Sequence, residues 1–201
     1  MLKRLFDIFL SSAGLIGSSP LWLLFATAII LEDGWPIFYS QARVGRNGRL
    51  FRAMKFRSMI KTAEKDTGPV QAVENDPRVT KLGRILRSTA MDELPQLINI
   101  FKGDMSFVGP RALRPKEKEV HGSPEEMRIE DVPGFKERLS VRPGLTGMAQ
   151  VYLPSDALRK VKFQYDLQYI KNQSFSLDVK LILLSFWITF RGKWETRQKK
   201  F

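Results

Sequence analysis

The sequence predicts an α+β fold with a broken apolar helix at its N-terminus, a small antiparallel sheet and several further helices, some of them amphipathic and interfacial. Three observations support this prediction. Residues 8–31 form a run of 24 residues without a charge. Residues 37–59 hold two mixed segments on either side of an Asn-Gly turn, which is the usual signal of a hairpin. Beyond residue 80, apolar residues recur at helical spacing.

Length and composition limit what the protein can be. A chain of 201 residues fits a single domain, 1–201. Its 33 Lys and Arg against 21 Asp and Glu leave a net charge of +12, which indicates an anionic partner: nucleic acid, a phosphate-rich substrate or an anionic membrane leaflet. Because there is no cysteine, disulfides and sulfur-ligated zinc are excluded, and the single histidine, His121, leaves almost nothing from which to build a His-ligated metal site or a Ser-His-Asp triad. Any metal is expected on oxygen ligands, which favours Mg²⁺.

The uncharged N-terminal run is long enough to cross a bilayer core of about 30 Å. Pro20 interrupts it, so we expect two apolar helices of about three turns each, joined by a break at Ser19 and Pro20, each too short to cross alone. Basic residues flank both ends, with Lys3 before the run and a cluster from Arg43 after it. Since Lys and Arg stay on the cytoplasmic side, residues 1–33 are expected to form a re-entrant helix. A cleaved signal peptide and a single kinked span are the alternatives.

Turn residues and apolar spacing divide the rest of the chain. The most regular helical pattern starts at Asp92, which occupies an N-cap position, and stops at Gly103. The apolar residues expected on its buried face are Leu94, Leu97, Ile98 and Phe101. We expect further helices over Thr80–Arg87, Ser123–Asp131, Val161–Asn172 and Leu177–Phe190. A loop is expected over Thr62–Arg78 and turns at Arg46–Arg49 and at Arg142–Gly144.

The adjacent carboxylates of Asp92 and Glu93 are the first candidates for chemistry. In one interpretation they only stabilise their helix, as a cap and as an acid near the positive end of the helix dipole. In the other they act on a phosphate-bearing substrate, because basic residues precede them and the segment Gly109-Pro110-Arg111 follows. The planar guanidinium of Arg111 suits phosphate oxygens.

Six segments of the chain carry a resemblance to a known family. They are Ser19-Pro20 within the apolar run, Lys55-Phe56-Arg57-Ser58-Met59, Asp92-Glu93-Leu94-Pro95-Gln96-Leu97, Gly103 to Arg111, Arg142-Pro143-Gly144-Leu145-Thr146-Gly147 and Tyr165-Asp166. Together they resemble the bacterial sugar transferase family and, within it, the small monotopic phosphoglycosyl transferases. The match runs in order from Leu2 to Leu184.

This resemblance implies transfer of a sugar 1-phosphate from a UDP-sugar to a polyprenyl phosphate such as undecaprenyl phosphate, the first membrane step of bacterial glycoconjugate synthesis. It implies that Asp92 attacks the sugar-bearing phosphorus with release of UMP, and that Glu93 helps to bind Mg²⁺. It places residues 34–201 as a catalytic part on the cytoplasmic face of the inner membrane, in contact with the inner leaflet. The positions that it assigns to substrate binding are Lys55, Arg87, Arg111, Arg142 and Asp166, and Ser19-Pro20 corresponds to the break of a re-entrant helix.

Elementary chemistry agrees with these roles. An aspartate is ionised at pH 7 and needs no general base, so the shortage of histidine is no obstacle. Two alternatives stay open: a membrane-anchored basic protein that binds an anionic partner without catalysis, and a transferase in which both carboxylates hold Mg²⁺ and no covalent intermediate forms. The first gives no reason for an acidic pair among cations, and we expect no nucleic-acid partner. The sugar and the oligomeric state, a homo-oligomer included, are not determined by the sequence.

Overall fold

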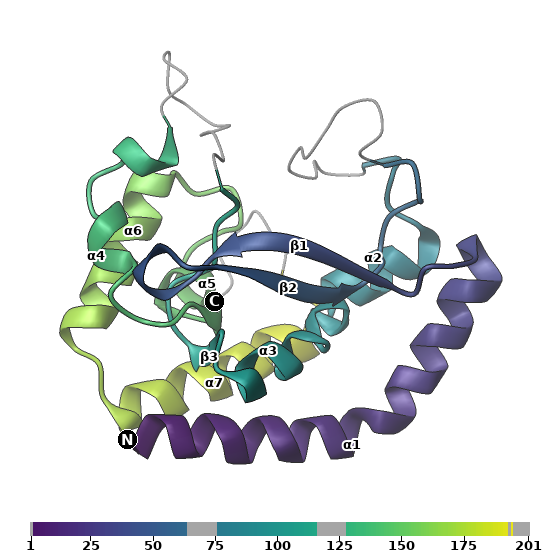
Figure 1. The fold of residues 1–201 in the computed structure, drawn as a ribbon, viewed down its shortest axis with the longest axis horizontal. Coiled ribbons are helices and arrows are strands. Elements are labelled where there is room, and N and C mark those ends of the chain that lie inside the picture. The colour runs from purple at the N-terminus through teal and green to yellow at the C-terminus, as the bar shows by residue number, and fades with distance from the viewer. Residues whose placement is uncertain (1, 64–75, 116–127, 193, 195–201) are drawn as a thin grey trace.

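A computed structural model describes residues 2–63, 76–115, 128–192 and 194 (Figure 1). Its mixture of helices with a small antiparallel sheet confirms the α+β prediction. The helices are α1 (Leu2–Asp33), α2 (Lys81–Ser88), α3 (Gln96–Lys102), α4 (Phe135–Arg138), α5 (Met148–Tyr152), α6 (Arg159–Lys171) and α7 (Phe175–Phe190). The strands are β1 (Phe38–Val44), β2 (Leu50–Phe56), β3 (Ser106–Val108) and β4 (Gly144–Thr146). Three short 3-10 turns are η1 (Arg46–Gly48), η2 (Met91–Glu93) and η3 (Ile129–Asp131).

Helix α1 is continuous but bends by 58° between its two arms, Leu2–Gly17 and Ser19–Asp33. Pro20 explains the bend, because its ring nitrogen cannot donate to the carbonyl of Ile16. The Ser19 hydroxyl donates to that carbonyl instead, over 2.8 Å. The two arms therefore meet beside the predicted break at Ser19 and Pro20, which confirms a bent pair of helices there. Each arm is longer than the three turns predicted, because the helix begins and ends in charged residues.

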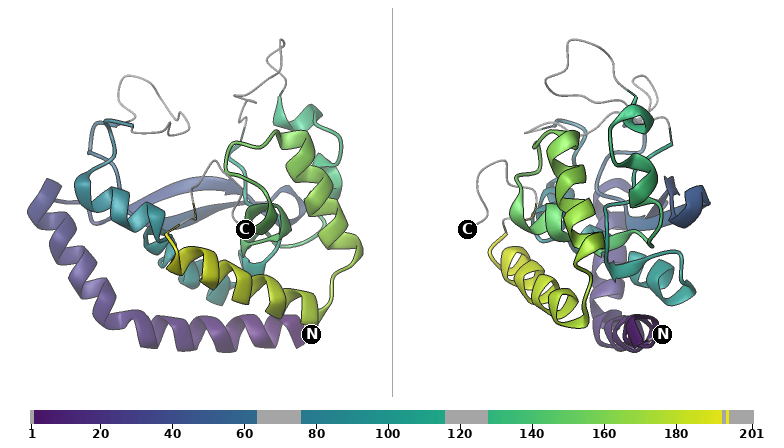
Figure 2. Two further views of the ribbon diagram at one scale, coloured as in Figure 1. Left: turned by 180° about the vertical axis from the view of Figure 1, so that it is seen from behind. Right: turned by 90° about the vertical axis from the view of Figure 1, so that its left-hand side faces the viewer.

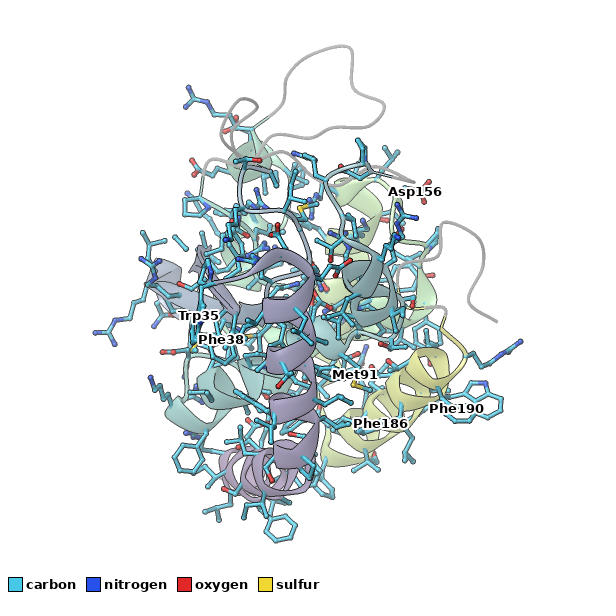
Figure 3. The ribbon with its side chains drawn as sticks, turned by 90° about the vertical axis from the view of Figure 1, so that its right-hand side faces the viewer. Trp35, Phe38, Met91, Asp156, Phe186 and Phe190 are labelled. Carbon is cyan, nitrogen blue, oxygen red and sulfur yellow. The ribbon has the colours of Figure 1, made fainter. Side chains whose placement is uncertain are left out.

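Large apolar side chains are exposed along α1 and α7. None of the described helices taken singly has the length and hydropathy of a membrane span, whereas the two arms of α1 satisfy both criteria together. Phe186 and Phe190 project from the outer side of α7 and are 65% and 86% exposed (Figure 3). The exposed apolar residues of α1 are Leu2, Leu5, Phe9, Ile16, Leu21, Leu23, Leu24 and Leu31.

The predicted hairpin is present as strands β1 and β2, which pair antiparallel from Phe38 opposite Phe56 to Val44 opposite Leu50. Its turn contains Asn47 with φ of 55°, a left-handed conformation that asparagine tolerates. The ring of Phe56 lies 5.3 Å from that of Trp22 on the second arm of α1, in an edge-to-face arrangement. The hairpin is thereby attached to α1.

A second pair of strands was not predicted. Strands β3 and β4 run parallel, with Ser106 opposite Gly144. The prediction of a turn at residues 142–144 is therefore wrong for Gly144, which begins β4. The backbone of Gly144 passes so close to that of Gly109 that a Cβ atom would collide with it. This close approach holds the Pro110–Arg111 segment against β4.

Helices α3 and α7 lie over the first arm of α1 (Figures 1 and 2). Apolar side chains of α3, β3, α6 and α7 form the largest core cluster, which includes Ile100 and Leu181, both fully buried. Polar contacts anchor α1 to the same region: Lys3 pairs with Asp178 of α7 over 2.6 Å, and buried Asp7 accepts hydrogen bonds from β3. The first arm of α1 is thus an integral part of the folded domain.

The remaining helix predictions have mixed outcomes. Those over Thr80–Arg87, Val161–Asn172 and Leu177–Phe190 are confirmed as α2, α6 and α7, with no end shifted by more than two residues. Of the helix predicted over Ser123–Asp131, the structure shows only the 3-10 turn η3. Residues 123–127 and most of the loop predicted over Thr62–Arg78 lie outside the described residues.

We predict that Asp7→Ala lowers the free energy of unfolding by about 2–4 kcal/mol. Its Oδ1 accepts from the Ser106 hydroxyl and the Phe107 N–H, each over 3.0 Å, and alanine leaves both buried donors without a partner. Asp7→Asn keeps an acceptor oxygen and serves as the control, with a smaller loss. Urea unfolding in detergent micelles gives the free energy of unfolding of both variants. Equal losses of stability in the two would contradict this explanation.

Candidate active site

Asp92 and Glu93 lie in the 3-10 turn η2, between α2 and α3, and both are buried. The prediction that Asp92 caps a helix is wrong, because α3 begins only at Gln96, after Pro95. The φ of Pro95, −62°, suits the start of a helix. Because proline has no backbone N–H, Pro95 cannot donate the hydrogen bond that would continue a helix from the residues before it. The chain enters η2 through Ala90, whose left-handed φ of 53° is a strained conformation for alanine.

Two cations from separate elements converge on these carboxylates. The Lys55 ammonium on β2 lies 2.6 Å from Glu93 Oε1 and 3.4 Å from Asp92 Oδ2. The Arg111 guanidinium, which follows β3, lies 3.1 Å from the same Glu93 oxygen. The Asp92 and Glu93 side chains are 9% and 6% exposed, whereas that of Arg111 is 41% exposed. The structure therefore brings together four of the residues selected from the sequence.

The electrostatics of Glu93 result from opposing effects. Burial alone would raise its pKa, but the charges of Lys55 and Arg111, together with their hydrogen bonds, lower it to about 2. Glu93 is consequently ionised throughout the physiological range of pH.

Glu93 borders a small pocket together with Lys55 and Arg111. The pocket is lined by Arg43, Ala53, Lys55, Glu93, Gln96, Met105, Arg111, Ala112 and Gly144. The hydrogen bonds that Glu93 accepts from Lys55 and Arg111 both end on its Oε1. Within the described ranges no group of three or more Asp, Glu, His or Cys could enclose a metal ion. Two adjacent carboxylates nevertheless suit Mg²⁺, which is usually held by one or two carboxylates together with water and substrate phosphates.

Arg87 and Arg142 occupy different surroundings. Arg87 lies on the last turn of α2, which packs against η2. The Nε of Arg142 donates to the carbonyl of Gly103 over 2.8 Å, at the C-terminal end of α3. The structure thus shows Arg142 supporting α3 and does not bring it to Glu93.

Asp166 reaches the site only through another residue. It lies on α6, 2% exposed, and its Oδ2 accepts from the Nε of Arg138 over 2.7 Å. Arg138 in turn donates to the backbone carbonyl of Arg111 over 3.0 Å and packs 4.0 Å from the ring centre of Phe163. Burial raises the pKa of Asp166, and the charge of Arg138 opposes this effect. Arg138 was not among the predicted site residues, because it lies in a charged run of a kind typical of a solvated surface.

Comparisons with known proteins show the family to which the chain belongs. The family model described as bacterial sugar transferase matches residues 1–192. The chain is 41% identical to the UDP-glucose:undecaprenyl-phosphate glucose-1-phosphate transferase of Klebsiella pneumoniae, over 95% of this chain and 40% of that protein. It is 36% identical to the undecaprenyl-phosphate galactose phosphotransferase of Salmonella typhimurium, over 94% of this chain and 40% of the relative. It is 34% identical to the exopolysaccharide production protein ExoY of Rhizobium meliloti, over 90% of this chain and 82% of that protein.

The ionised state of Glu93 predicts an acid-dependent stability difference. Its pKa in the folded protein, about 2, is below the ordinary value of 4.5, so its ionisation favours folding above pH 5, and this contribution is lost as the pH falls from 4.5 toward 2. Its size is about 3 kcal/mol. We expect the difference in unfolding free energy between wild type and Glu93→Gln to be constant from pH 7 to 5 and to shrink below that. A difference that stays constant to pH 3 would contradict the assignment.

The buried pair of Arg138 and Asp166 predicts non-additive effects. Arg138→Met leaves the Asp166 carboxylate buried without its partner and should cost about 3–5 kcal/mol of stability. Adding Asp166→Leu removes the uncompensated charge and should recover most of that loss. Tryptophan fluorescence during urea unfolding gives the free energy of unfolding of the wild type, of Arg138→Met and of the double variant. A double variant no more stable than Arg138→Met would show that the carboxylate is compensated elsewhere.

Proposed function

Because the chain belongs to the bacterial sugar transferase family, we propose that it transfers a sugar 1-phosphate from a UDP-sugar to undecaprenyl phosphate or a related polyprenyl phosphate. The observation that supports this most directly is the convergence of Lys55 and Arg111 on two adjacent buried carboxylates. Such a site can hold a diphosphate beside an anionic nucleophile, because the cations offset the repulsion between them.

In the proposed reaction, a carboxylate oxygen of Asp92 attacks the sugar-bearing phosphorus of the UDP-sugar. The new bond joins that oxygen to phosphorus, the bridging P–O bond of the diphosphate breaks, and UMP leaves with the bonding electrons. An oxygen of the polyprenyl phosphate then attacks the same phosphorus and displaces Asp92. The products are polyprenyl-diphosphate-sugar and the regenerated carboxylate.

We assign the role of nucleophile to Asp92 and a positioning role to Glu93. Lys55 lies closer to Glu93 than to Asp92, and Glu93 also receives a hydrogen bond from Arg111. A carboxylate held by two cations is a weaker nucleophile and a better orienting group. Glu93 is therefore assigned to positioning Lys55 and Arg111, whose charges face the transferring phosphoryl group.

We propose that Glu93, through its oxygen Oε2, would help to hold Mg²⁺. The ion would neutralise charge on the diphosphate and on the leaving UMP. The positive charges of Lys55 and Arg111 would also offset the charge of the diphosphate. Because both residues bond to Oε1 of Glu93, Oε2 is the oxygen that we assign to the ion.

The lipid acceptor requires a site near the membrane surface. We propose that α1 enters the inner leaflet at its bend and leaves by the same cytoplasmic face, with α7 at the interface. The bent pair of arms and the exposed apolar side chains of α1 and α7 support this arrangement. Burying such side chains in lipid is favourable, whereas water would leave a large apolar surface exposed.

The test is UMP release from a panel of UDP-sugars, including UDP-glucose and UDP-galactose, with and without undecaprenyl phosphate and Mg²⁺. We expect one donor to support turnover, EDTA to abolish it, and Asp92→Asn to reduce it by more than about a thousandfold, because the covalent step is lost. Asp131→Asn, which removes an exposed carboxylate at the end of η3, is the control and should retain activity.

The intermediate can be sought by intact-protein mass spectrometry with the donor alone. An added phosphosugar on wild type that is absent from Asp92→Asn is the expected result. Full activity of Asp92→Asn would overturn the assignment of Asp92 as the nucleophile. No turnover with any donor would favour a membrane-anchored binding protein.

A further inference from the structure

We propose that Glu32 and Arg4, at opposite ends of α1, are positioning residues that hold α2 and α3 at the spacing which places Asp92 and Glu93. This inference rests on the proposed function for its kinetic consequence, but its structural part is independent of that function. In Figure 1, α1 passes beneath the domain with its first arm and rises with its second arm toward α2. Its two ends contact the two helices that flank η2.

Glu32 caps the N-terminal end of α2. Its carboxylate accepts from the N–H of Lys81 over 2.8 Å and from that of Leu82 over 3.2 Å. These are the first two amides of the helix, which have no partner within it. A negative charge at this end also interacts favourably with the helix dipole. The local cap, Thr80, accepts from Gly83, so Glu32 adds a second attachment that comes from α1.

Arg4 caps the C-terminal end of α3. Its guanidinium donates to the carbonyls of Ile100 and Phe101, each over 2.6 Å. These carbonyls belong to the last turn of α3, where acceptors lack partners within the helix and a cation is favoured by the dipole. The two terminal nitrogens of the arginine fork bond one carbonyl each. Gly103, with φ of 94°, then turns the chain away from the helix.

The two caps matter for the site because the connection between α2 and α3 is short. Residues 89–95 join them and include both carboxylates and the strained residue Ala90. Any change in the separation of α2 and α3 is therefore transmitted directly to Asp92 and Glu93. Helix α1 contacts both α2 and α3. Its apolar contacts, like its two caps, reach each of them: Ile29 clusters with Leu86 of α2, and Gly14 faces Leu97 of α3.

The bend of 58° sets the distance between the two ends of α1. One cap of this kind is a small part of the stability of a folded domain. A displacement of about 1 Å between reacting groups can nevertheless lower a rate about a hundredfold. The caps are thus expected to affect turnover more than stability.

The structural test is a distance measurement between α2 and α3. The natural chain has no cysteine, so Arg84→Cys on α2 and Lys102→Cys on α3, both exposed, give two specific spin-label sites. Pulsed electron resonance is recorded on full-length protein in lipid nanodiscs. We expect Glu32→Ala and Arg4→Met each to shift or broaden the distance distribution, and Glu32→Gln, whose oxygen still accepts, to restore it. Glu137→Ala and Lys171→Met, which remove exposed charges elsewhere, are matched controls and should leave it unchanged.

The kinetic test uses the same substitutions without labels. We expect Glu32→Ala and Arg4→Met to lower kcat about tenfold, with KM for the UDP-sugar changed less than about twofold, and Glu32→Gln to recover most of the rate. Unchanged distances in both variants would overturn the proposal, as would changed distances with full kcat. If the wild type shows no turnover at all, the proposed function fails, and the distances alone decide whether α1 positions the two helices.

Discussion

Two neighbouring carboxylates that are withdrawn from water repel each other and lose their hydration, so a fold that keeps them ionised must bring cations to them. Lys55 and Arg111 meet this requirement for Glu93. The two cations come from the β1–β2 hairpin and from the segment after β3, which are far apart in the chain. The site therefore exists only when the hairpin, η2 and the β3–β4 pair are all docked together.

The surrounding structure serves this convergence. Arg138, paired with buried Asp166, binds the backbone carbonyl of Arg111, and the absence of a side chain at Gly144 lets the segment before Arg111 lie against β4. Arginine is suited to such a place because its fork can bond a carboxylate and a carbonyl together. Arg142 supports α3 from its C-terminal end in a similar way. Arg138 and Arg142 therefore stabilise the structure around the site, whereas Lys55 and Arg111 line the pocket.

Helix α1 combines two kinds of surface because helical periodicity separates them. Lys3 and Asp7, four residues apart, lie on one face and bond to α7 and β3. Leu2, Leu5 and Phe9 recur on the other face and are exposed. One helix can therefore present an apolar surface to lipid and a polar one to the domain. Its bend follows from a single proline, and the hydroxyl of Ser19 keeps the backbone bonded there.

The sequence by itself determined what local chemistry decides: the bend near Pro20, the hairpin around Asn47, the helices α2, α6 and α7, and the candidates Asp92, Glu93, Lys55 and Arg111. Only the tertiary structure decided the rest. Strands β3 and β4 have three residues each, too short for an alternating pattern, and they pair across a long separation in the chain. Whether Asp166 meets substrate or Arg138 depends on burial, which a charged run does not reveal. Asp92 belongs to a 3-10 turn because Pro95 delays the helix, and its place among cations is a consequence of packing between distant segments.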